Sequence, residues 1–171
     1  MRNKQLQKLC LAGIFSAAVF VLTAYLHIPS HTGYTHIGDG VIFLAAAMLP
    51  LPYAVSVAVI GAALADLLTG YAIWAPASIL IKALIVLPFS HGKGRIITVR
   101  NLLSLVPAVA LTVGGYYLYE AILTQNATAA LFGIPGYVTQ FVLSSVLFIA
   151  VGTAIDNIKN HKKRKNGDLE I

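Results

Sequence analysis

The feature that most constrains the fold is a series of long apolar segments separated by short polar breaks, such as residues 9–26 and 102–123. At a rise of 1.5 Å per residue, an 18-residue helix is about 27 Å long, close to the roughly 30 Å of a bilayer's hydrocarbon core. Hydrophobic residues make up 58% of the 171 residues and charged residues only 11%, against roughly 25% in typical soluble domains. The sequence therefore predicts an all-α integral membrane protein with a single membrane domain over residues 1–171.

The basic residues indicate how the chain crosses the membrane. Twelve Lys and Arg face six Asp and Glu, and eleven of the twelve lie before the first apolar segment, within residues 93–100 or after the last segment. Because basic residues accumulate on the cytoplasmic side, this alternation favours membrane topology over a nucleic-acid-binding surface. It predicts a six-transmembrane-helix bundle with both termini in the cytoplasm. The expected spans are about residues 9–26, 40–51, 52–69, 74–89, 102–123 and 137–156, followed by a basic cytoplasmic tail, 157–171.

Residues 41–68 allow two interpretations, because they could form one long helix or two shorter ones broken at Pro50 and Pro52. Proline interrupts a helix. Only the two-helix arrangement returns all three basic clusters to one side of the membrane. We therefore expect two antiparallel helices joined at these prolines. The short first helix is accommodated by local bilayer thinning or by packing inside the bundle.

Three ionisable residues, Asp66, Lys82 and Glu120, lie inside predicted spans. A charge at the bilayer centre costs roughly 2.5 to 3.5 kcal/mol on insertion scales, so such residues face the bundle or a cavity. One interpretation is an internal Asp66–Lys82 pair that only braces two neighbouring helices. The other is that at least one of these residues contacts a ligand.

Aromatic residues gather in the half of the bundle predicted to lie outside, where they form either a lipid-interface belt or a surface on which a flat heterocycle stacks. Asp39 lies in the outer loop between two glycines and either caps the next helix or joins this site. Glu120 and Gln140 are expected to contribute to the same site from the opposite helices. The predicted substrate-binding residues are His36, Asp39, Asp66, Tyr71, Trp74, Lys82, Glu120 and Gln140.

Motifs for catalysis, ATP hydrolysis and metal binding are not found in the sequence. His27, His31 and His36 share one loop, but their spacing matches no compact metal motif. We expect no catalytic residue, no metal and no cofactor bound by this chain, so that any ATP is used by partner subunits. Small residues on the first helix, Ala12, Gly13, Ser16 and Ala17, let another helix approach closely and are the predicted docking face for a partner.

Three sequence blocks resemble a known family, the substrate-binding S components of energy-coupling factor (ECF) vitamin transporters. They are residues 36–47 (HIGDGVIFLAAA), 61–71 (GAALADLLTGY) and 74–82 (WAPASILIK). The most similar branch is the riboflavin, hydroxymethylpyrimidine and pyridoxine type. One departure concerns the family's Ala-x-x-x-Ala docking pattern on helix one, for which Ala12-x-x-x-Ser16 and Gly13-x-x-x-Ala17 stand here.

The resemblance implies a subunit of the bacterial cell membrane that binds a vitamin or vitamin precursor near the outer face, beneath the loop after helix one. It also implies three partners, a transmembrane scaffold subunit and two ABC ATPase subunits. The alternative function is a stand-alone proton-coupled secondary transporter in which Asp66 or Glu120 titrates. An intramembrane enzyme is disfavoured by the missing motifs.

The topology is testable by cysteine accessibility after Cys10 is replaced by serine. Because all three basic clusters should lie in the cytoplasm, single cysteines at positions 30–36 and 126–132 should react with an impermeant reagent from outside. Cysteines at positions 91–98 should react only from inside. Labelling of positions 91–98 from outside would contradict the six-span topology.

Overall fold

The computed structural model describes residues 2–29, 33–92 and 94–167, and the described chain is almost entirely helical. His31, Lys93 and the last four residues of the predicted tail lie outside the described residues. The main helices are α1 (Arg2–Ala24), α2 (Asp39–Met48), α3 (Leu51–Leu68), α4 (Ala75–Val86), α6 (Leu105–Thr124) and α8 (Ile134–Gly167). Shorter elements are the 3-10 turns η1 (Ala72–Trp74) and η2 (Leu131–Gly133), α5 (Val99–Leu103) and α7 (Ala127–Ala130).

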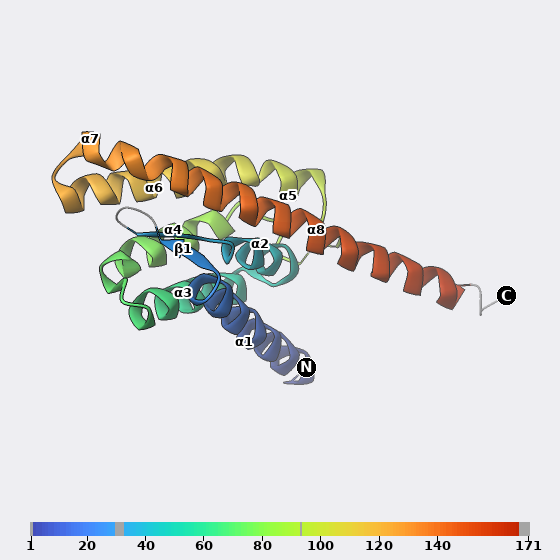
Figure 1. Cartoon of the computed structure of the whole chain (residues 1–171). Coiled ribbons are helices and arrows are strands. Elements are labelled where there is room, and N and C mark those ends of the chain that lie inside the picture. Colours follow the sequence, from blue (N-terminus) through green and yellow to red (C-terminus); the bar gives the residue numbers. More distant parts are fainter. Residues whose placement is uncertain (1, 30–32, 93, 168–171) are drawn as a thin grey trace.

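The bundle has two distinct ends. One, the basic end, comprises the start of α1, the turn at residues 49–50, the described residues of the loop at 87–98 and the C-terminal end of α8. The other, the hairpin end, comprises residues 25–29 and 33–38, whose two short strands pair as a β-hairpin, together with residues 69–74 and 125–133. Figure 1 shows the N- and C-termini on the same side of the molecule and the turn at α7 on the opposite side. The three basic clusters of the sequence belong to the basic end.

Four helical segments are long and apolar enough to cross a membrane: Asn3–Ala24, Leu51–Leu68, Val99–Thr124 and Ala127–Lys162. Two shorter apolar segments, Asp39–Met48 and Ala72–Val86, complete the bundle. The long helices expose large apolar side chains, including Ile14, Val106 and Ile122. In water these surfaces would be unfavourable, whereas lipid tails solvate them. The chain is therefore an all-α membrane protein apart from a small hairpin.

The short helix α2 lies at the centre of the bundle, where it packs against α1, α3, α4 and α8. Nine of its ten residues are buried, and Phe43 stacks on Phe89 with ring centroids 5.5 Å apart and meets Phe148 edge-on. Ten residues span only about 15 Å. Its neighbours surround α2, so this helix does not need to be long enough to cross the lipid. Packing inside the bundle therefore explains why the second predicted span, residues 40–51, is short.

The loop at residues 87–98 closes the bundle below α2. The backbone N–H groups of His91 and Gly92 donate to the carbonyls of Ala46 and Ala47, at 3.0 and 2.9 Å, and so satisfy the C-terminal end of the helix. Gly92 has a φ of 82°, and a Cβ there would lie 2.9 Å from the carbonyl oxygen of Met48. Only glycine fits this approach without strain.

Two buried side chains hold this loop against the helices. Asn101 accepts from the backbone of Ser90 at 2.9 Å and donates to the carbonyl of Ile96 at 2.8 Å. Asp156 of α8 accepts from the backbone N–H groups of Ile96 and Ile97, at 3.0 and 2.9 Å. The basic loop is thus a fixed part of the fold.

The predicted span boundaries differ from the helices at three places. The fifth span begins as α5 and breaks at Ser104, because Pro107 has no N–H to donate to the carbonyl of Leu103. The predicted soluble tail instead continues α8 to Gly167. The loop after α1 forms an antiparallel hairpin of β1 (His27–Pro29) and β2 (Tyr34–His36), in which His27 pairs with His36.

Candidate functional site

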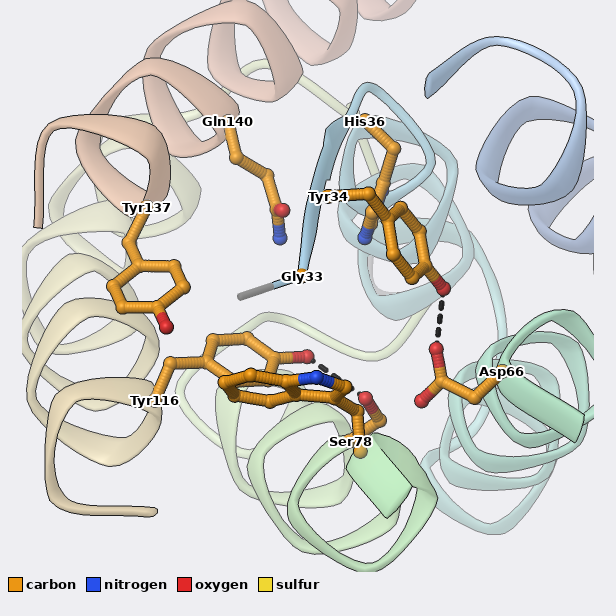
Figure 2. Close-up of a pocket in the computed structure, with 9 residues that line it drawn as sticks. Gly33, Tyr34, His36, Asp66, Ser78, Tyr116, Tyr137 and Gln140 are labelled. Carbon is orange, nitrogen blue, oxygen red and sulfur yellow. Dashed lines mark hydrogen bonds between the residues drawn. The ribbon is translucent and has the colours of Figure 1, made fainter. Parts of the chain in front are cut away.

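A cavity lies at the hairpin end, among the hairpin and helices from both halves of the chain (Figure 2). It offers about 320 Å³ of space free of protein atoms, part of which is open to solvent. The described lining residues are Gly33, Tyr34, His36, Asp66, Trp74, Ser78, Tyr116, Tyr137 and Gln140.

Beneath the cavity lies a buried ion pair. Lys82 of α4 donates to the carboxylate of Asp39 at 2.8 Å, and each side chain is only 1% exposed. Gln140 of α8 donates to the same carboxylate oxygen at 2.9 Å. The Lys82 ammonium also lies 4.9 Å from the centroid of the Tyr116 ring, where a cation is attracted to the aromatic face. These contacts connect α2, α4, α6 and α8 at one point.

This pair corrects two expectations. Asp39 does not cap α2 through its side chain: Gly38 occupies the N-cap position without a side-chain bond, and Asp39 is the first helical residue. Lys82 does not pair with Asp66, as the bracing interpretation proposed, but with Asp39. The physical reason is that α2 begins inside the bundle and contacts both α4 and α8, which brings its first carboxylate to the depth of Lys82.

Asp66 instead bonds to the hairpin. One carboxylate oxygen of Asp66 accepts a short hydrogen bond from the hydroxyl of Tyr34. Burial, together with the negative charge of Asp66, raises the pKa of Tyr34 well above its usual range, so the phenol keeps its proton. Thr35 adds a hydrogen bond of 3.3 Å to the carbonyl of Gly136 in α8. The hairpin is thereby attached to both walls of the cavity.

His36 faces the cavity from β2 in its neutral form. Its Nδ1 accepts from the backbone N–H of Gly38 at 3.1 Å, which leaves the proton on Nε2. Burial lowers the pKa of His36 to about 4. Gly38 itself is required here because any Cβ would collide with Thr23 of α1. His36 thus offers the cavity a single N–H donor and no charge near neutral pH.

Aromatic rings form the remaining wall. Trp74 lies 6.0 Å from Tyr116, and Tyr116 stacks on Tyr137 at 5.3 Å with an interplanar angle of 24°. Ser78 and Tyr116 share a hydrogen bond of 3.0 Å. Behind this wall, the hydroxyl of Tyr137 donates to Glu120 at 2.5 Å. The cavity therefore combines π surfaces with a few placed polar groups, as small-molecule sites do.

Four of the eight predicted substrate-binding residues line the cavity: His36, Asp66, Trp74 and Gln140. The other four lie around it. Asp39 and Lys82 form the ion pair below, Glu120 lies behind Tyr137, and Tyr71 packs on Tyr34 with ring centroids 4.4 Å apart. Whether any of them contacts substrate stays a prediction.

Five lining residues are absent from the predicted substrate-binding set: Gly33, Tyr34, Ser78, Tyr116 and Tyr137. The three tyrosines among them belong to the outer-half aromatic residues on which a heterocycle was expected to stack. Helical spacing was an available signal for three of them, because residues three or four apart share a helix face. Ser78 precedes Lys82 by four, Tyr116 precedes Glu120 by four, and Tyr137 precedes Gln140 by three. Gly33 and Tyr34 depend on the hairpin, which carried no such signal.

The predicted docking residues divide between two faces of α1. Ala12 is buried, and Ser16 is half-buried with its carbonyl against Gly61 of α3. Gly13 and Ala17 are exposed, and no atom lies within 4 Å of a Cβ built on Gly13. A shallow groove runs here between α1 and α3, lined by Leu9, Ala12, Gly13, Ser16, Pro52, Tyr53, Ser56 and Ile60.

Comparison with known proteins gives one family. The sequence profile of a family described as "ECF-type riboflavin transporter, S component" matches residues 3–157, which is most of the chain. The search of curated proteins finds no match.

The ion pair can be tested by a double-mutant cycle on thermal unfolding in detergent. Asp39→Asn and Lys82→Met should each lower stability by about 3 to 5 kcal/mol, because each leaves a buried charge uncompensated. The double variant should lose much less than the sum. Lys8→Met, at an exposed lysine of α1, is the control and should change little. Additive losses in the double variant would contradict the pairing.

Proposed function

The chain belongs to the family of ECF-type riboflavin transporter S components, and on that premise we propose that it captures a vitamin or vitamin precursor in the cavity at the hairpin end. An S component is the substrate-binding part of a transporter and not an enzyme. The observation that carries the proposal is the cavity itself, where aromatic rings and polar side chains from several helices meet a hairpin that bonds to both walls. Such a lining suits a small flat heterocycle.

We propose that the protein crosses the bacterial cell membrane six times, with the basic end in the cytoplasm and the hairpin end outside. Support comes from the two chain ends lying on the same side, which requires an even number of crossings. The basic clusters at that end agree with the positive-inside tendency. The cavity would then open toward the extracellular medium, from which a binding subunit must collect its ligand.

We further propose that the exposed face of α1, with Gly13 and Ala17, docks the transmembrane scaffold subunit, while two ABC ATPase subunits supply energy. The chain has no phosphate-binding loop of its own. Exposed small residues let a helix of another subunit approach closely. The groove between α1 and α3 gives that helix a place to lie.

Ligand capture is tested at Trp74, whose ring lines the cavity. Trp74→Leu keeps an apolar side chain but is smaller and removes the stacking surface, which is worth about 0.5 to 1.5 kcal/mol. It should therefore weaken affinity about two- to tenfold, measured by calorimetry with the tightest binder among pyridoxine, hydroxymethylpyrimidine and riboflavin. Trp74→Phe retains a ring and should lose less. Unchanged affinity in both folded variants would remove Trp74 from the site.

Docking is tested by co-purification and by uptake in cells that express the scaffold and ATPase subunits. Gly13→Leu and Ala17→Leu should reduce both, since a bulky side chain holds helices apart. Ala150→Leu, the same enlargement at an exposed position of α8, is the matched control and should assemble normally. Normal assembly of both α1 variants would place the docking face elsewhere. Uptake without the partner subunits would contradict the proposed function.

A further inference from the structure

Within the helices around the cavity, carboxylates outnumber Lys and Arg side chains. The carboxylates are Asp39, Asp66 and Glu120, whereas Lys82 is the one Lys or Arg in the sequence outside the three basic clusters. Lys82 is committed to Asp39. His36 cannot compensate, because its Nδ1 accepts a hydrogen bond. The cavity is thus an unfavourable environment for an anion and a favourable one for a cation.

Asp66 is the carboxylate that faces the cavity. The residue is only 2% exposed. One oxygen accepts from Tyr34; the other, Oδ2, meets no hydrogen-bond partner at full geometry among the described residues, although the Ser78 hydroxyl also interacts with this carboxylate. Figure 2 shows this second oxygen on the cavity side, between Tyr34 and Ser78. Because a carboxylate oxygen can accept more than one hydrogen bond, a ligand that brings an N–H group to Oδ2 forms a charge-assisted hydrogen bond there.

The neighbouring polar groups complete a pattern of acceptors and donors. Gln140 donates its amide N–H to Asp39, which orients the side chain and leaves its carbonyl oxygen as an acceptor beside the cavity. His36 presents Nε2–H, a donor. A ligand that matches this pattern carries donors toward Asp66 and Gln140 and an acceptor toward His36.

We propose that the site selects a weakly basic, single-ring nitrogen heterocycle with N–H donors, of the aminopyrimidine or pyridine class, and that Asp66 is its counter-ion. This inference rests on the proposed function and deepens it. The cavity offers about 320 Å³, part of it open to solvent, and one ring needs less of this space than the three fused rings of riboflavin. The isoalloxazine ring of riboflavin has no nitrogen that is protonated near neutral pH, so it would not neutralise the charge of Asp66.

The test uses the purified full chain in detergent and four probes: 4-amino-5-hydroxymethyl-2-methylpyrimidine, pyridoxine, riboflavin and nicotinate. The chain has a single tryptophan, Trp74, which lines the cavity, so quenching of its fluorescence reports binding of the colourless probes. Quenching of flavin fluorescence reports riboflavin. One of the two basic probes should bind at least about tenfold more tightly than riboflavin and the nicotinate anion.

Asp66→Asn should weaken the preferred basic probe about tenfold or more, as loss of a charge-assisted hydrogen bond predicts. Asp156→Asn, which removes a buried carboxylate at the basic end, is the control and should leave affinity unchanged. Thermal unfolding of each variant separates misfolding from lost binding, and Asp66→Glu, which keeps the charge, should restore part of the affinity.

Riboflavin binding that exceeds that of both basic probes would overturn this inference while leaving vitamin capture intact. Equal affinity of the preferred probe for the wild type and a folded Asp66→Asn would also overturn it. Failure of all four probes to bind would overturn it as well. The proposed function fails separately, if the assembled complex with its ATPases takes up none of these molecules.

Discussion

The ion pair between Asp39 and Lys82 joins more of the structure than any other polar contact beneath the cavity. It ties the first residue of α2 to the middle of α4, while Gln140 brings in α8 and the Tyr116 ring brings in α6. Two charges buried at 1% exposure are costly unless they are paired and further hydrogen-bonded. The pairing and the further hydrogen bonds form only while the four helices keep their relative positions. Any change in the geometry of the cavity floor would therefore lower the stability of the fold.

The bundle contains long helices that face lipid and a short helix that is enclosed by protein. Long helices such as α1 and α6 present apolar surface to lipid, whereas the short α2 is enclosed by protein. An enclosed helix can begin and end within the bundle, because its backbone groups find partners there, as Ala46 and Ala47 do in the loop after α4. This is how α2 places a carboxylate deep in the protein and still leaves room above it for a cavity.

Sequence reasoning located the apolar helices, the proline-broken turn at residues 49–52 and the family, because hydrophobic length, proline chemistry and charge clusters are local signals. It identified His36, Asp66, Trp74 and Gln140, which line the cavity. Of the two interpretations left open for Lys82, the one that paired it with Asp66 was wrong, since depth along a helix does not reveal which neighbour lies opposite. The β-hairpin was missed because His27 and His36 pair through backbone groups, which leave no periodic pattern in so short a loop.

The hairpin is attached to both walls of the cavity, and under the proposed function this attachment has a kinetic consequence. Tyr34 reaches across to Asp66 and Thr35 to α8, so a ligand that enters on this side must first break or lengthen these bonds. Association by this route is slower than diffusion allows, and the same bonds then oppose the escape of the ligand. For a subunit that captures a vitamin, as proposed, the resulting long residence time leaves the occupied subunit time to find its partners.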